Sequence, residues 1–387
     1  MTADDLRREV AKRPGDHAGN RRFASPILSN QPEVGELRCP AVGKQHVARL
    51  HVAGALQPRN TLTGYAPSVF ATLAGLYPAL SGEGGLSDVL SDQLEAGLGM
   101  LGTGRVVDAV IDTGDAVDSW RLADGIVRGL VAESHLEPPV VKACIVGPYS
   151  IGRRVGESLP GGSARRDATL AAAELLNLEL RELFEAGVVV VQVQEDALTS
   201  LDSGADDERT LAADAFSRLL EGVSGHVSLA ITGGNADQVG PGTLFDAPFA
   251  SYLFDLIEGP DNWRLIAKAP GDRGIICGVA DTRTSSPDSE AVMIWAARYA
   301  SSLGGRGPER VGLAPAAGLE ALPRDVARSK LAGLAEAARK AALPDDELMT
   351  QLDPRAIDAR SAALGRFEKP PKNTVRGKPA KKKRSKR

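Results

Sequence analysis

The feature that most constrains this chain is an alternation of short apolar runs with longer stretches of helical periodicity. Each apolar run holds about four to eight residues, a length typical of strands buried on both faces of a parallel sheet. Parallel strands need a crossover between them, and the helical stretches supply one. The eight runs are Ala48–Gly54, Gly97–Leu101, Val140–Gly147, Val188–Val193, Val227–Thr232, a weaker Trp263–Ala267, Gly274–Val279 and Arg310–Ala314.

The stretches between the runs have clear helix signals. Ala168–Ala186 is rich in Ala, Leu and Glu and ends before Gly187, a residue suited to a helix C-terminus. Arg209–Glu221 and Asp325–Lys340 show the same pattern. Eight strands alternating with helices favour a (β/α)8 TIM barrel over a doubly wound sheet. No GxGxxG or GxxxxGK[ST] follows a run, so no nucleotide-binding fingerprint is present.

The charge is divided unevenly along the chain. The net charge is −4, but Lys369 to Arg387 contain ten basic residues and no acidic one. The first 368 residues therefore carry 36 basic and 50 acidic groups. An acidic body disfavours nucleic acid as a partner, so any weak contact of that kind would come through the basic tail.

Cysteine usage and the absence of long apolar segments predict a cytoplasmic protein. Cys39, Cys144 and Cys277 are far apart and form no CxxC pair, which argues against a disulfide framework or a zinc ribbon. No apolar run approaches the roughly 18 residues of a membrane helix, and the N-terminus does not resemble a secretion signal.

These observations predict four segments. Residues 1–45 form an extension with little periodicity, and 46–345 form the barrel. Residues 346–368 form a C-terminal helical segment. Residues 369–387 form an unstructured basic tail.

The chemistry of such a barrel takes place at the C-terminal ends of its strands. We therefore expect the site to be built from the residues that end or follow the apolar runs. These are Gly54–Leu56, Thr103–Arg105, Gly147–Ser150, Gln192–Asp196, Ala230–Asn235, Gly278–Asp281 and Pro315–Gly318.

Taken in order, these strand ends resemble the catalytic barrel of the cobalamin-independent methionine synthase family and its short, single-barrel relatives. KACIVGPYS is similar to the family's K-x-x-i-x-GPxT, and LFEAGVVVVQVQEDAL is similar to L-x-x-aG-x-x-x-iQiDEPaL. DQLEAGLGMLGTGR resembles Q-x-x-aGlD-x-l-x-dGe, and LHVAGALQPR resembles the iGS-P start. SLAITGGN falls where the family has HxCxGN, and PAAGL where it has PDCGL. The collinear motifs cover about His51 to Arg339 and imply a methyltransferase of methionine biosynthesis.

The resemblance also implies a zinc site. In the family, Zn²⁺ binds the substrate thiol, lowers its pKa and presents a thiolate to a methyl donor. Position by position, the His falls on Ala230, the two Cys on Thr232 and Ala317, and the carboxylate on Glu258. Alanine cannot bind a metal and a lone Thr hydroxyl is a weak zinc ligand, so we expect the zinc cofactor to be missing.

The positions that would hold homocysteine differ in the same way. The family's Ser, Glu and Asp fall on Ala55, Arg105 and Gln194. A carboxylate that would receive the substrate ammonium has become Arg105, which repels an amino group and attracts a carboxylate or phosphate. We therefore expect a small anionic ligand. If methyl transfer persists, the resemblance implies a donor other than folate, such as a corrinoid methyl-donor protein.

Other polar residues at the strand ends are candidate site residues, and several of them could instead have a structural role. Gln194 and Glu195 are the candidate catalytic residues, although Glu195 could instead be a structural hydrogen-bonding residue. Asn235 and Asp281 are candidate ligand-binding residues, but Asp281 could also brace the next loop. The residues after GPYS could form an anion clamp or a solvated loop; they are Arg153, Arg154, Arg165 and Arg166.

Three functions remain open at this point. The chain could be a methyltransferase acting on a small thiol such as homocysteine. It could be a zinc-independent barrel that binds or transforms an anionic small molecule, or a relative without catalytic activity. A relocated metal site would need His51, Cys144 and Cys277, which are more simply explained as buried core residues.

Overall fold

The computed structural model describes residues 69–78, 85–110, 114–132, 137–156, 162–202, 204–345 and 347–348. The chain divides into two units, one ending at Ala342 and the other beginning at Leu343. All the helices and strands named below belong to the first unit. The expected segments 1–45 and 369–387 lie outside the described residues, as does most of 346–368.

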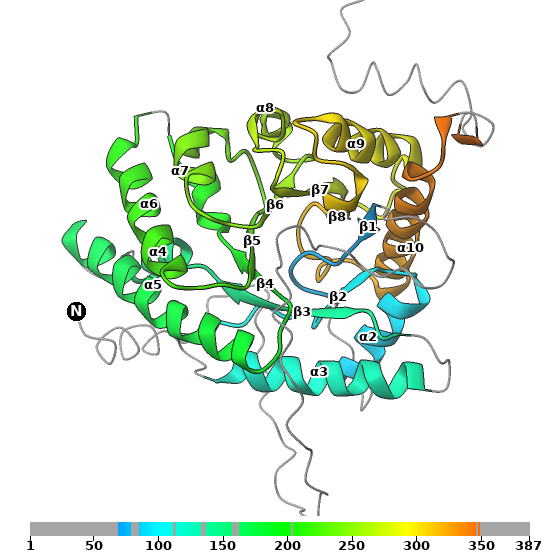
Figure 1. Ribbon diagram of the computed structural model, residues 1–387, viewed down its shortest axis with the longest axis horizontal. Helices are drawn as coiled ribbons and strands as arrows, with labels where there is room; N and C mark the ends of the chain where they lie inside the picture. The colour runs from blue at the N-terminus through cyan, green and yellow to red at the C-terminus, as the bar shows by residue number, and fades with distance from the viewer. Residues whose placement is uncertain are drawn as a thin grey trace, which may run out of the picture. The chain divides into compact units, whose positions relative to one another are not determined.

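Eight parallel strands form a TIM barrel, which confirms the expected fold class (Figure 1). Each strand pairs with its neighbour in sequence, and β8 pairs with β1. A single bridge between Thr72 and Met100 joins β1 to β2 and closes the ring. The strands are β1 Phe70–Ala71, β2 Met100–Gly102, β3 Val140–Val146, β4 Val190–Gln194, β5 His226–Ile231, β6 Ser251–Asp255, β7 Gly274–Ala280 and β8 Val311–Pro315.

Helices surround the barrel and connect successive strands (Figure 1). The three helices expected from composition are present as α5 (Gly162–Glu185), α6 (Asp206–Leu220) and α10 (Arg324–Ala341). None of the helices in the described part of the chain is long and apolar enough to cross a membrane. The remaining helices are α2 Gly85–Glu95, α3 Asp115–Val131, α4 Pro148–Gly156, α7 Pro241–Phe245, α8 Trp263–Lys268 and α9 Glu290–Ser302, with 3-10 turns η2 Asp196–Ser200, η3 Asp237–Val239, η4 Pro260–Asn262 and η5 Pro308–Arg310.

Two strands lie elsewhere than the sequence predicts. The run Ala48–Gly54 is outside the described residues, and β1 (Phe70–Ala71) takes the first place in the ring. The run Trp263–Ala267 is part of helix α8, and the sixth strand is β6. Because Ser251 and Asp255 at the two ends of β6 are polar yet fully buried, this strand does not have the apolar pattern of its neighbours.

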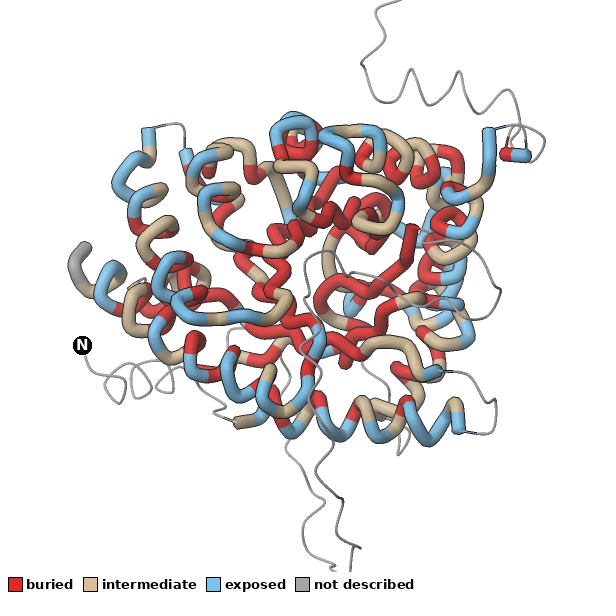
Figure 2. Tube along the Cα trace, viewed as in Figure 1, coloured by how far each residue is buried: buried red, intermediate tan, exposed pale blue. Residues whose placement is uncertain are grey.

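The core lies inside the ring of strands, which Figure 2 shows as the buried centre of the barrel. One residue or two from each of seven strand segments pack together there. Side chains alternate along a strand, so every second residue belongs to this interior. The interior cluster consists of Phe70, Ala74, Met100, Val190, Ala230, Leu253, Ile276 and Ala314.

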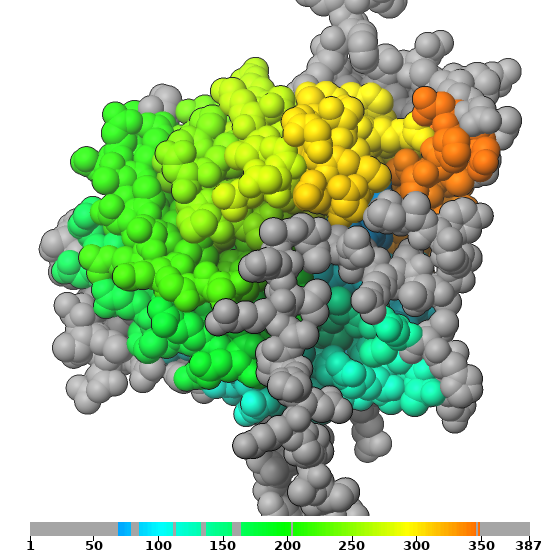
Figure 3. All heavy atoms as spheres, in the orientation of Figure 1, coloured from blue at the N-terminus to red at the C-terminus, as the bar shows by residue number. Residues whose placement is uncertain are grey.

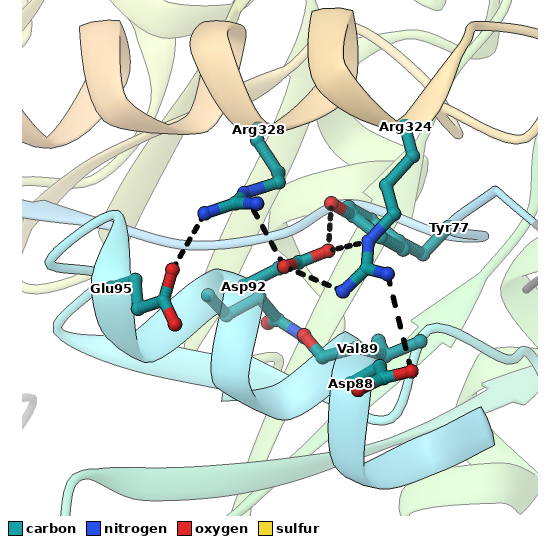
Figure 4. A network of polar contacts seen from close by, with 8 residues as sticks. Tyr77, Asp88, Val89, Asp92, Glu95, Arg324 and Arg328 are labelled. Carbon is teal, nitrogen blue, oxygen red and sulfur yellow. Dashed lines mark hydrogen bonds and ion pairs between the residues drawn. The ribbon is translucent and has the colours of Figure 1, made fainter. Parts of the chain in front are cut away.

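A polar network joins the first and last helices of the barrel (Figure 4). Asp92 of α2 is 2% exposed and receives two hydrogen bonds from Arg324 of α10, at 2.6 and 2.9 Å. Tyr77 donates to the same carboxylate at 3.0 Å, and Arg328 lies 3.3 Å from it. Figure 3 shows the colours running from cyan through green and yellow to orange across the face of the molecule.

Candidate functional site

The C-terminal ends of β4 and β5 carry a hydrogen-bonded cluster of three polar residues. Asp196 accepts from the hydroxyl and the N–H of Thr232, at 2.7 and 3.1 Å, through one carboxylate oxygen. Its other oxygen accepts from Gln194 Nε2 at 2.7 Å. The cluster brings Gln194 and Thr232, both singled out from the sequence, to one place at the barrel mouth.

Gln194 also faces the loop that follows β1. Its Oε1 is buried and has no hydrogen-bond partner. Gly75, with a φ of 66°, lies so close that a Cβ there would stand 3.5 Å from this oxygen and 3.4 Å from Gly318 Cα. Leu319 N–H donates to Leu76 O at 2.8 Å, so the loops after β1 and β8 meet beside Gln194.

Glu195 is fully buried and holds the start of helix α4. Its two oxygens accept from the N–H groups of Tyr149 and Ser150, both at 2.8 Å, and from Ser150 Oγ at 2.7 Å. Burial raises the pKa of Glu195 to about 7, against the opposing effect of these hydrogen bonds. The geometry matches the structural reading of Glu195; a catalytic role stays a prediction.

The turn after β5 is held by residues of the β6 end that the sequence did not single out. Asp255 is fully buried and accepts from the N–H groups of Gly233, Ile257 and Glu258, at 2.8 to 3.0 Å. Burial raises the pKa of Asp255, and these three hydrogen bonds oppose that shift. The N–H of Gly233 is therefore used within the protein and is not available to an anion.

Two residues of η4 brace the same turn. Asn262 donates to Gly234 O and Asp255 O and accepts from Ala236 N–H at 2.7 Å. Asn235 accepts from Asp261 N–H at 2.9 Å. Asn235 thus lies at the mouth, as expected, with its side-chain oxygen bound to the neighbouring loop.

The four positions that resemble zinc ligands do not come together as a donor set. Ala230 is buried in the interior cluster, and Ala317 is half-buried after β8. Thr232 donates its hydroxyl to Asp196, and Glu258 forms an ion pair with Arg283 at 2.9 Å. Among the described residues, no three His, Cys, Asp or Glu side chains are grouped so as to hold a metal ion.

The remaining candidates are scattered. Ala55 and His51 lie outside the described residues; the loop that follows the observed β1 is instead Thr72–Pro78. Cys144 and Cys277 are buried and free. Asp281 accepts from Arg283 N–H and the Thr284 hydroxyl, both at 2.8 Å, and these bonds outweigh burial and lower its pKa.

The arginines at the mouth divide into paired and unpaired ones. Arg154, Arg165 and Arg166 form ion pairs with Asp108, Glu208 and Asp214 respectively, and Arg153 hydrogen bonds with Tyr149. Arg105, in the loop after β2, is exposed, and its side chain has no partner in the described part of the chain. Of the arginines expected to bind an anion, Arg105 is the one left free.

Sequence reasoning missed three buried polar residues, namely Asp255, Asn262 and Lys142. Each is less than 2% exposed. Asp255 and Asn262 follow a strand that was not recognised, so no signal pointed to them. Lys142 stands inside an otherwise apolar run, and a charged residue type within a buried strand is a signal that could have been used.

Comparisons of the sequence find two methionine synthases. No family model matches the chain. A methionine synthase of Methanothermobacter thermautotrophicus is 29% identical over 219 residues, and one of Methanothermobacter marburgensis is 24% identical over 278 residues. These matches cover 54% and 64% of this chain, and 66% and 85% of those relatives.

Solved structures show the same fold at lower identity. A B12-independent methionine synthase of Shewanella superposes with a TM-score of 0.57 at 17% identity, covering 73% of this chain and 99% of that one. A second, described as a putative B12-independent methionine synthase of Listeria monocytogenes, has a TM-score of 0.52 at 13% identity, with 71% and 98% covered. The sequence matches and the shared barrel confirm the resemblance seen in the motifs. The chain is similar in sequence to two methionine synthases and shares the barrel fold of B12-independent methionine synthases.

Proposed function

We propose that this barrel binds a small anionic molecule at its mouth and does not use a zinc-bound thiolate. The relatives are named methionine synthases, and methyl transfer is the reaction class they suggest. The proposal rests on the residues that stand at the four positions aligned with the family's zinc ligands. Two alanines, a Thr engaged with Asp196 and a Glu engaged with Arg283 do not fit a zinc ion.

The ligand contacts follow from what is free at the mouth. Arg105 supplies an unpaired positive charge, and a guanidinium can bind a carboxylate or phosphate through two parallel hydrogen bonds. The unpartnered Oε1 of Gln194 accepts a hydrogen bond from a ligand hydroxyl or amide. Glu195 acts as a positioning residue, because it fixes α4 and the strand end that carries Gln194.

A thermal-shift panel tests this proposal. Carboxylates, phosphates and L-homocysteine, the last with and without Zn²⁺, are added in excess to the full chain. A ligand that binds the folded state at a hundred times its Kd stabilises it by about 2.7 kcal/mol. We expect an anion to raise Tm and homocysteine to have no effect under either condition.

Two variants make the panel specific. Arg105→Ala should abolish the shift caused by the anion, whereas Arg121→Ala should preserve it. Arg121 is a matched control because it is exposed on α3, with one weak contact to Asp118 at 3.6 Å. A rise in Tm with zinc and homocysteine would contradict the proposal. So would a rise in Tm with an anion that is unchanged in Arg105→Ala.

A further inference from the structure

A lysine stands inside the barrel with no acidic partner. Lys142 of β3 is 1% exposed, and its register neighbour on β2 is Gly102. Its Nζ donates to Leu73 O at 2.6 Å and to Gln192 Oε1 at 2.7 Å. Both acceptors are neutral, and within the described ranges no carboxylate pairs with this amine.

Hydrogen-bond counting gives the protonation state. A charged ammonium has three N–H donors, and burying one without a counter-ion and with a donor unused is costly. A neutral amine has two N–H donors, which Leu73 O and Gln192 Oε1 satisfy completely. Burial lowers the pKa of Lys142, and the one titratable group acting on it is the Cys144 thiol on the same strand. The neutral amine retains a lone pair that no described residue uses.

A second buried lysine shows the contrast. Lys330 of α10 is 5% exposed, but its Nζ lies 2.8 Å from Asp288 and donates to Ser286 O at 3.0 Å. The Lys330 amine is therefore held by a carboxylate, which the Lys142 amine is not. The chain therefore contains two buried lysines in opposite electrostatic settings.

Unused donors lie beside the Lys142 amine. Gln192 and Ser228 are each 1% exposed, and they face each other in register on β4 and β5. Gln192 Nε2 and Ser228 Oγ are buried and have no hydrogen-bond partner. Orphaned donors of this kind mark a place where an oxygen-bearing group can be bound.

The interior above this amine is lined by small side chains. In a barrel of this type, alternate strands contribute four side chains to each layer. Toward the mouth from Lys142, the strands carry small residues, namely Cys144 on β3, Ala230 on β5 and Gly278 on β7. The Lys142 Cε lies 3.6 Å from where a Cβ on Gly102 would stand, an ordinary van der Waals distance.

We propose that Lys142 is a nucleophilic amine that forms an imine with a small aldehyde or ketone inside the barrel. The Nζ lone pair attacks the carbonyl carbon, and the proton released by nitrogen passes to the carbonyl oxygen to give a carbinolamine. Loss of one water then forms the C=N bond, with no oxidant or reductant needed. Gln192 Nε2 and Ser228 Oγ are placed to donate to the oxygen that leaves. This inference does not depend on the anion site at Arg105.

Reductive trapping on the folded, full-length chain tests the inference. The chain is treated at pH 7 with formaldehyde or with pyruvate, each with cyanoborohydride, and the modified lysines are identified by peptide mass spectrometry. Formaldehyde tests access for the smallest carbonyl compound, and pyruvate tests a larger, anionic one. Lys330 serves as the buried, ion-paired control and Lys268 as the exposed control.

We expect Lys142 to be modified by at least one probe, at a rate about tenfold or more above that of Lys330, because the Lys330 amine must break its buried ion pair with Asp288 before it can react. Lys142→Met should lose that adduct while the other lysines react as before. Because the peptide map locates the adduct in the wild-type chain, the test does not depend on that variant folding. Two results would overturn the inference. One is that Lys268 is labelled but neither probe labels Lys142. The other is that Lys142 and Lys330 are labelled equally.

Discussion

At the scale of single residues, the barrel keeps several titratable side chains away from water without giving them charged partners. His226 at the start of β5 shares a hydrogen bond of 2.9 Å with Ser251 Oγ. Burial lowers the pKa of His226 to about 4. The folded state therefore holds this ring neutral at a pH where the unfolded chain would protonate it.

This sets a direction for the pH dependence of stability. The unfolded chain binds a proton at His226 near pH 6.5 and the folded chain only near pH 4. The contribution of the neutral His226 to the free energy of unfolding is therefore full above pH 6.5 and is lost as the pH falls through 4. Between these values the free energy of unfolding should fall at up to about 1.4 kcal/mol per pH unit from this group alone. Urea unfolding of the wild type and His226→Gln at pH 7 and pH 5 measures it. An equal loss in both chains would mean that His226 contributes nothing.

Some of the site could be predicted at this scale and some could not. The placing of Gln194, Thr232 and Asn235 at the mouth follows from their positions at strand ends, because side chains there share one edge of the barrel. Which of their atoms are already bonded within the protein depends on partners far away in sequence. The hydrogen bond from Gly233 to Asp255 and the ion pairs of Arg154 and Arg165 are of this kind.

At the scale of elements, helix α4 is fixed to the neighbouring strand by one carboxylate. Glu195 reaches the first N–H groups of α4 only because Gly147, between β3 and α4, has no side chain. A Cβ at Gly147 would overlap the Glu195 carboxyl group. Helix N-termini carry unsatisfied N–H groups and a partial positive charge, so a buried carboxylate there stabilises the helix.

Gly147→Ala should therefore destabilise the protein although alanine is the better helix former. We expect a loss of about 2 kcal/mol, the usual size of an overpacking effect. Gly125→Ala is the matched control, because a Cβ at that position in α3 meets nothing within 4 Å. The control should gain up to about 1 kcal/mol from helix propensity. Equal effects of the two changes in urea unfolding would contradict the role given to Gly147.

The strands show where sequence patterns are informative. Six of the eight apolar runs coincide with barrel strands, since parallel strands covered on both faces are apolar throughout. The β6 sequence SYLFD is apolar only in its middle, and WRLIAK, which forms α8, has a comparable apolar content. Composition alone does not separate such a strand from a buried helix turn.

At the scale of the whole molecule, closing the ring requires the segments around β1 and β8 to meet. The strand contact between β1 and β2 is a single bridge at Thr72, so helix packing carries much of the closure. Asp92 provides the polar part of it, with Arg324 and Arg328 from α10 and Tyr77 from the loop after β1 (Figure 4).

Asp92→Asn should weaken that closure. Charged hydrogen bonds in a buried setting contribute more than neutral ones, and we expect a loss of about 2 kcal/mol in the free energy of unfolding. Asp124→Asn is the matched control, because Asp124 pairs with Arg128 within the exposed face of α3 at 2.6 Å. That pair should contribute about 0.5 kcal/mol or less. A similar loss in both variants would contradict a special role for Asp92.

We propose that this barrel, which resembles those of methionine synthases, works without zinc-bound thiolate chemistry. The direct measurement is the zinc content, by mass spectrometry, of the full chain produced in zinc-supplemented medium and purified without chelator. A built zinc site binds tightly enough to survive purification, so the account predicts less than about a tenth of an equivalent per chain. One zinc per chain, together with methionine formed from homocysteine, would contradict it.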